Sequence, residues 1–209
     1  MELDVLKIDG TKAGRKAVLD DAIFGIEPND HAIYLDVKQY LAAQRQGTSK
    51  TKDRSEVAYS TKKIIRQKGS GGARHGSIKS NINVGGGRSH GPRPRNYDFK
   101  LNKKVKQLAR FSALSYKAQD NAIAVVEPFT MQAPKTKDFL NIVHNLRVND
   151  RRILFIVPEK SENIVLSSRN LENVKVITPN NINTYEIMKA YSVVLVDGVQ
   201  DSLKTEYKS

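Results

Sequence analysis

Cysteine is absent from this 209-residue sequence, and its absence excludes disulfides, thiolate metal ligands and cysteine nucleophiles. Long apolar runs are absent as well, since none reaches the roughly 18 residues that a membrane-spanning helix needs. The N-terminus, residues 1–8, lacks the basic-then-apolar order of a signal peptide. We therefore expect a cytoplasmic protein with no membrane partner.

Sequence patterns for catalysis and cofactor binding are also missing. The glycine-rich run at 69–76 lacks the spacing of a phosphate-binding loop, and Arg74 stands where the dinucleotide fingerprint requires its third glycine. Asp197 and Gly198, at the end of an expected strand, are better explained as a turn than as an active-site edge. We expect no enzyme activity, no cofactor and no small-molecule substrate.

The four histidines show no metal-binding spacing. They are His31, His75, His90 and His144. We expect no metal site, and we expect structural or solvated roles for His31 and His144. His75 and His90 lie in a basic stretch, where contact with RNA and simple solvation are both open.

Acidic residues are scarce in one part of the chain. Residues 45–106 contain 17 Lys/Arg and 3 Asp/Glu, whereas the remainder contains 18 and 19, so one stretch carries the whole net charge of +13. Nine of the 13 glycines also fall there. Such a block is either a solvated tail or an arm that binds a polyanion. Asp53 and Glu56, its first acids, are expected to pair locally with cations.

Outside this stretch the pattern indicates an α/β fold. Strands are expected at 3–8, 16–19, 122–126, 153–157, 174–177 and 193–196. Helices are expected at 31–46, 102–117, 136–146, near 162–169, at 183–190 and over the final residues. The last four strands are continuous apolar runs, which are typical of a parallel sheet buried on both faces. We predict a three-layer α/β/α sandwich with a mainly parallel central sheet.

Residues 47–97 show neither helical nor strand periodicity. A segment of about 50 residues without secondary structure is either functional or disordered. It interrupts an otherwise regular fold, which favours a positioned loop over a nonspecific tail. We predict a single α/β domain over 1–209, with 47–97 inserted as an extended basic loop that is mobile in the free protein.

The loop is predicted to bind RNA, because Lys and Arg displace counterions from phosphates and glycines allow close backbone approach. An extended arm of about 25 residues reaches roughly 80 Å, far into a folded RNA. The residues expected to bind are Lys50, Lys52, Arg54, Lys62, Lys63, Arg66, Lys68, Arg74, His75, Lys79, Arg88, His90, Arg93 and Arg95. For Lys103, Lys106 and Arg110 on the next helix, RNA contact and a solvated face are equally open.

Several motifs then resemble a known family. They are RQKGSGGARHGSIKS at 66–80, GGG at 85–87, GPRPRNY at 91–97, LNKKV at 101–105 and APKTK at 133–137. The first four are similar to the loop and following helix of the L-four family of large-subunit ribosomal proteins, and APKTK fits the same family further downstream. The sequence departs from the usual bacterial pattern at 58–65, Gly72, Asn81 and 88–90.

The resemblance implies a structural constituent of the large ribosomal subunit that binds large-subunit rRNA, contacts neighbouring ribosomal proteins and acts early in assembly. It also implies that the loop lines the nascent-peptide exit tunnel. The tip would comprise Arg66, Gln67, Lys68, Gly69, Ser70 and Arg74. An RNA-modifying enzyme and a DNA-compacting protein are the alternatives from other classes, although no catalytic cluster is visible and a duplex offers such a loop no target.

Overall fold

The computed structural model describes residues 1–146, 151–159 and 161–207. The chain divides into two units. We call the unit formed by Met1–Leu41 and Lys100–Ser209 the body, and the unit formed by Ala42–Phe99 the loop unit.

The body is built around one six-stranded sheet of order β2-β1-β3-β6-β4-β5. Its strands are β1 (Glu2–Leu6), β2 (Lys12–Val18), β3 (Ile123–Val126), β4 (Ile153–Ile156), β5 (Val174–Ile177) and β6 (Ser192–Val196). The edge strand β2 is antiparallel to β1, and the other neighbouring strands of the described sheet are parallel. The predicted mainly parallel sheet is confirmed.

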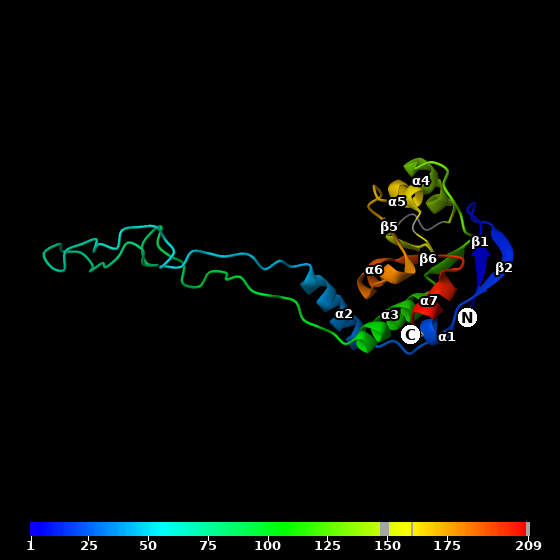
Figure 1. The fold of residues 1–209 in the computed structure, drawn as a ribbon, viewed down its shortest axis with the longest axis horizontal. Coiled ribbons are helices and arrows are strands. Elements are labelled where there is room, and N and C mark those ends of the chain that lie inside the picture. Colours follow the sequence, from blue (N-terminus) through cyan, green and yellow to red (C-terminus); the bar gives the residue numbers. More distant parts are fainter. Residues whose placement is uncertain (147–150, 160, 208–209) are drawn as a thin grey trace. The chain divides into compact units, whose positions relative to one another are not determined.

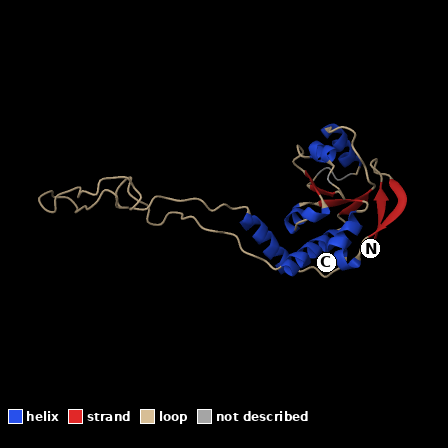
Figure 2. Ribbon diagram, viewed as in Figure 1, coloured by secondary structure: helices blue, strands red, loops and turns tan. Residues whose placement is uncertain are grey.

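Helices cover both faces of this sheet. They are α1 (Asp21–Phe24), α2 (Asp30–Ala43), α3 (Lys103–Gln119), α4 (Thr136–Asn145), α5 (Glu162–Ser168), α6 (Thr184–Lys189) and α7 (Val199–Tyr207), with a short 3₁₀ helix, η1 (Pro179–Asn181). Helices α4 and α5 pack together on one side, whereas α1, α3 and α6 lie on the other (Figures 1 and 2). The predicted three-layer sandwich is therefore confirmed. Among the described helices, none is long and apolar enough to cross a membrane.

The core lies along the central strands. Every residue of β4 and β6 is buried, as their continuous apolar runs predict. Phe139 of α4 meets Phe155 of β4 edge to face, with ring centroids 5.3 Å apart, and both side chains are fully buried. Burial of such a side chain contributes about 1.5–3 kcal/mol relative to exposure, so this pair ties one helical layer to the sheet.

Helix α3 packs through small residues rather than through a stripe of leucines. Its buried positions include Ala109, Ser112 and Ala113, and the helix packs against α1 and α6. Leu114 is buried, whereas Leu108 is 39% exposed. The buried face of α3 is therefore made mainly of alanine and serine side chains.

Helix α2 begins where predicted and ends early. The Asn29 carboxamide oxygen accepts from the Ala32 N–H at 3.0 Å, which caps the helix start. The helix ends at Ala43 rather than at residue 46. Its buried Asp36 carboxylate accepts from the Thr184 hydroxyl at 2.5 Å, so a polar pair links α2 to α6 inside the body.

Candidate nucleic-acid interface

The loop unit presents its cations to solvent. All 14 residues predicted to bind RNA fall within it, and all are exposed except His75 and Lys79, which are half-buried. Residues 44–102, which are described throughout, contain no helix or strand. The missing periodicity of this segment therefore indicated its irregular backbone correctly.

Two arms of the loop unit run side by side and are joined by backbone hydrogen bonds. Four N–H to carbonyl pairs cross between them, at donor–acceptor distances of 2.9–3.1 Å: Arg95 to Gly47, Thr51 to Pro92, Arg88 to Lys52, and Ile64 to Gly76. The outgoing arm is thus 47–64 and the returning arm 76–95. These few cross-links give the segment a hairpin-like course without a regular ladder.

The segment between the two arms is the closed end of the loop unit. Residues 65–75 lie beyond the outermost cross-link, in which the Ile64 N–H donates to the Gly76 carbonyl at 3.0 Å, and Figure 1 shows them as the turn where the chain reverses. All six residues assigned to the tip fall in this segment. Arg66, Lys68 and Arg74 are exposed there.

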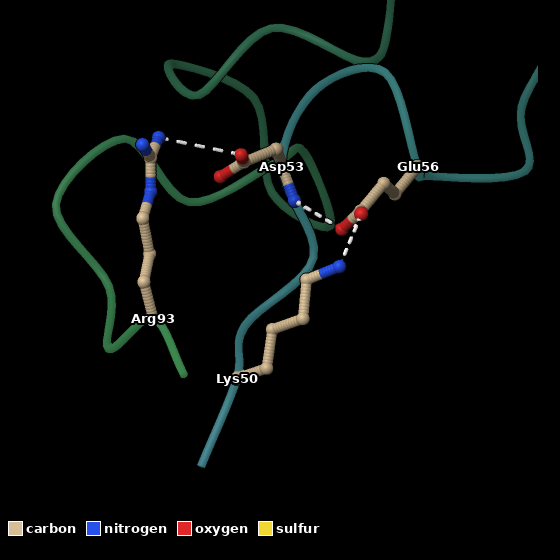
Figure 3. Close-up of polar contacts among 4 residues, drawn as sticks. All are labelled: Lys50, Asp53, Glu56 and Arg93. Carbon is tan, nitrogen blue, oxygen red and sulfur yellow. Dashed lines mark hydrogen bonds and ion pairs between the residues drawn. The ribbon is translucent and has the colours of Figure 1, made fainter. Parts of the chain in front are cut away.

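Both early acidic residues of the loop unit are held by cations (Figure 3). The Lys50 ammonium group pairs with Glu56, whose carboxylate also accepts from the Asp53 N–H at 3.2 Å. Arg93 Nη2 lies 3.3 Å from Asp53 Oδ2. Glu56 therefore pairs locally as predicted, whereas the prediction was wrong for Asp53, whose partner lies 40 residues away on the other arm.

These contacts perturb the Glu56 carboxyl. The hydrogen bond from Lys50, followed by the one from the Asp53 backbone, lowers the pKa of Glu56 below its ordinary value. The charges of Lys50 and Arg93 are already balanced by their carboxylate partners. They are consequently poorer candidates for phosphate contacts than the sequence alone indicated.

Glycine allows the two arms to touch. A Cβ on Gly87 would lie 2.4 Å from the backbone nitrogen of Arg54. Any other residue at this position would therefore displace the backbone of the opposite arm. Gly87 is also buried, although it lies in an otherwise exposed unit. Within the glycine run at 85–87, Gly85 and Gly87 therefore pack against the opposite arm.

Two aromatic residues of the loop unit were not assigned to the site from the sequence. Two guanidinium groups lie over the Tyr97 ring, with Arg45 Cζ 3.7 Å and Arg95 Cζ 4.4 Å from its centroid. The hydrogen bond from Arg95, aided by the nearby charges, lowers the pKa of Tyr97. Tyr59, on the outgoing arm, is 48% exposed. The interleaving of aromatic and basic residues was the signal that would have identified both.

Two body residues that the sequence raised as candidates, Asp197 and Lys106, contact other side chains of the body. Asp197 Oδ2 pairs with Arg15 at 3.2 Å and its Oδ1 accepts from Gln200 Nε2 at 2.8 Å, so this carboxylate fastens a strand end. Lys106 Nζ donates to Gln39 Oε1 at 3.1 Å, while Lys103 is exposed. Within the described ranges, no three His, Asp or Glu side chains lie close enough to hold a metal ion.

An α/β body that carries a glycine-rich loop studded with exposed cations defines a class of proteins that bind nucleic acid through an extended arm. The chain belongs to the ribosomal protein L4/L1 family, whose model matches residues 17–206. This confirms the resemblance drawn from the loop motifs. The family is structural rather than enzymatic, which excludes the RNA-modifying alternative.

Curated relatives are similar over nearly their whole length, and each is named large ribosomal subunit protein uL4. The chain is 60% identical to the protein of Parabacteroides distasonis over 209 residues, which is 100% of both chains. It is 57% identical to the protein of Phocaeicola vulgatus over 197 residues, 94% of this chain and 95% of that one. It is 59% identical to the protein of Bacteroides fragilis over the same shares.

Proposed function

We propose that this chain is a structural constituent of the large ribosomal subunit and binds large-subunit rRNA through its loop unit. The observation that carries the proposal is the charge of that unit, which holds 13 Lys/Arg against 3 Asp/Glu, with nearly all of the cations exposed. A polyanion is the partner that such a surface requires. The family and the names of the relatives point to ribosomal RNA as that polyanion.

The structure refines which cations are available to phosphate. Of the 12 Lys and Arg residues predicted to bind, Lys50 and Arg93 are engaged with carboxylates, which leaves ten without a described ion pair. Each phosphate contact lowers the slope of log K against log salt by about 0.7 to 0.9. Ten contacts therefore set an upper bound of roughly 7 to 9 on the magnitude of that slope.

The tip at 65–75 is proposed to line the nascent-peptide exit tunnel, with the arms held against rRNA on either side. Its place at the closed end of the loop unit and the motif at 66–80 support this assignment. We further propose that the chain enters the subunit early in assembly and contacts neighbouring ribosomal proteins. Its site of action would be the cytoplasmic ribosome, with the nascent peptide passing the tip.

Charge reversal at the tip tests the tunnel assignment. Lys68→Glu places a carboxylate at the closed end, whereas Lys204→Glu makes the same change on α7 of the body and serves as the control. We expect the tip variant to alter the response to inhibitors that bind in the tunnel while it still enters the subunit. Normal translation and an unchanged inhibitor response would refute the assignment.

Retention on the ribosome tests the role as a constituent. A tagged chain is expected to sediment with the large subunit after a high-salt wash and to leave it only when the RNA is unfolded. Loss at moderate salt, or sedimentation as free protein, would show a transient binder instead.

A further inference from the structure

A recess of about 510 Å³ opens between the arms of the loop unit. Tyr59 lines it from the outgoing arm together with Val57, and Gly85 and Arg88 line it from the returning arm. Lys52 completes its edge. The volume falls within the roughly 300–1,000 Å³ typical of small-ligand sites, and it accommodates a single nucleotide.

The aromatic wall of this recess is held in place by its surroundings. The Tyr59 N–H donates to the Val57 carbonyl at 3.1 Å, which forms a tight turn at the base of this side chain. Gly85 adopts a φ of +81°, and a Cβ there would lie 3.1 Å from the Tyr59 hydroxyl oxygen. Glycine thus permits the turn and leaves the space beside the ring open. Even so, the tyrosine remains 48% exposed.

The returning arm beyond the recess is also fixed. The Asn83 side chain donates to the Ser77 carbonyl at 3.1 Å, and the Gly87 N–H donates to the Lys79 carbonyl at 3.0 Å. These bonds close the segment 77–87 into a compact turn that carries Gly85 to the recess. The opening is therefore part of a hydrogen-bonded structure rather than a gap between two free chains.

Two cations, Lys52 and Arg88, line the recess from opposite arms. The Arg88 N–H donates to the Lys52 carbonyl at 2.9 Å, so the backbone joins these residues directly while both side chains are exposed. Among the described residues, neither cation is in an ion pair. An aromatic side chain and cations lining one recess are the combination that binds single-stranded nucleic acid, because the base stacks while the phosphate is neutralised.

We propose that this recess takes one unstacked nucleotide of the rRNA, whose base stacks on Tyr59 and whose phosphates contact Lys52 and Arg88. The inference rests on the proposed function. It adds one stacking contact with a base to a loop whose other proposed contacts are with phosphates. A duplex does not satisfy the recess, because its bases are stacked on one another and unavailable to the ring. The site therefore selects a bulged or looped nucleotide.

The test is the affinity of the full-length chain for purified large-subunit rRNA, measured across a series of salt concentrations. Tyr59→Ala is expected to weaken binding about 5- to 150-fold, the range for loss of one base–aromatic stack, with an unchanged salt slope. Tyr59→Phe keeps the ring and should bind as the unmodified protein does. Lys52→Gln and Arg88→Gln should each reduce the slope by about 0.7 to 0.9.

A matched control is Tyr34→Ala, since Tyr34 is a similarly exposed tyrosine on α2, at 56%. It should leave affinity unchanged. As a second measurement, tyrosine nitration of the rRNA complex should be suppressed at Tyr59 and continue at Tyr34. Circular dichroism of each variant reports whether the body is folded.

The outcomes separate this inference from the proposed function. If the unmodified chain fails to bind rRNA, the proposed function is wrong. If it binds and Tyr59→Ala binds equally well, only the nucleotide site is overturned. An equal loss in Tyr59→Phe would also overturn it, because the hydroxyl rather than the ring would then carry the contact. Loss of subunit retention with normal binding to naked rRNA would assign the recess to a protein neighbour instead.

Discussion

The closed end of the loop unit offers a quantitative test of which charges face RNA. Arg66, Lys68 and Arg74 are exposed, and within the described structure none of them is in an ion pair. Replacing all three with glutamine should reduce the magnitude of the salt slope by about 2.1 to 2.7, at 0.7 to 0.9 per contact. If affinity at 1 M salt is unchanged, this predicts a loss of roughly 50- to 170-fold at 0.15 M salt.

The control uses cations whose charge is already balanced. Lys50→Gln combined with Arg93→Gln removes two charges that face Glu56 and Asp53. The magnitude of the salt slope should therefore decrease by less per removed charge than in the tip variant. Fluorescence anisotropy with labelled large-subunit rRNA, at salt concentrations from about 0.05 to 0.3 M, measures both variants over a range where phosphate contacts dominate. An unchanged slope in the tip variant, or an equal loss per charge in the control, would refute the reasoning.

The remaining predictions concern the two units separately. Deletion of 50–95 should leave cooperative thermal unfolding of the body, because the sheet lies outside the deleted segment; a broad transition would contradict this. Thr184→Val removes a hydrogen bond to buried Asp36 and should cost about 1–3 kcal/mol in urea denaturation, with a smaller loss pointing to another donor. Phe155→Ala should cost about 3–5 kcal/mol by the same assay through lost packing, and an unchanged midpoint would disprove its core role. The lowered pKa of Glu56 means that its pairing is fully present above the ordinary carboxyl pKa and is lost as pH falls through the lowered value; a carboxyl NMR titration with an ordinary midpoint would contradict the ion pair.

Continuous apolar runs made the buried strands predictable, whereas exposed elements were placed less well. Strand β5 was predicted with its observed bounds, and β4 was predicted to within one residue. Strand β2 begins at Lys12 rather than at residue 16, because an edge strand with polar side chains carries no apolar signal. Helix α1 was missed since its four residues are too few to show a period.

For the candidate site, composition identified the segment but not its internal contacts. The cations are exposed because the segment has few apolar side chains that could bury them. This shortage is visible in the composition of the sequence. The pairing of Asp53 with Arg93 depends on how the arms run together, which local spacing does not encode. Helix α2 was expected to continue to residue 46, but Arg45 stacks on Tyr97 instead, a tertiary contact that overrides its helical propensity.

The two segments of the body, before and after the loop unit, are held together by contacts that do not involve the loop unit. Within the body, the segment before the loop unit pairs with the segment after it, Val5 with Val125 and Leu6 with Val126, and the Asn29 N–H donates to the Ser112 hydroxyl at 3.0 Å. A protease cut within the loop unit would therefore sever the polypeptide without dissolving the sheet, and we expect the two halves to stay together. Two separately synthesised fragments should therefore assemble into the folded body, and the break would alter only the loop unit.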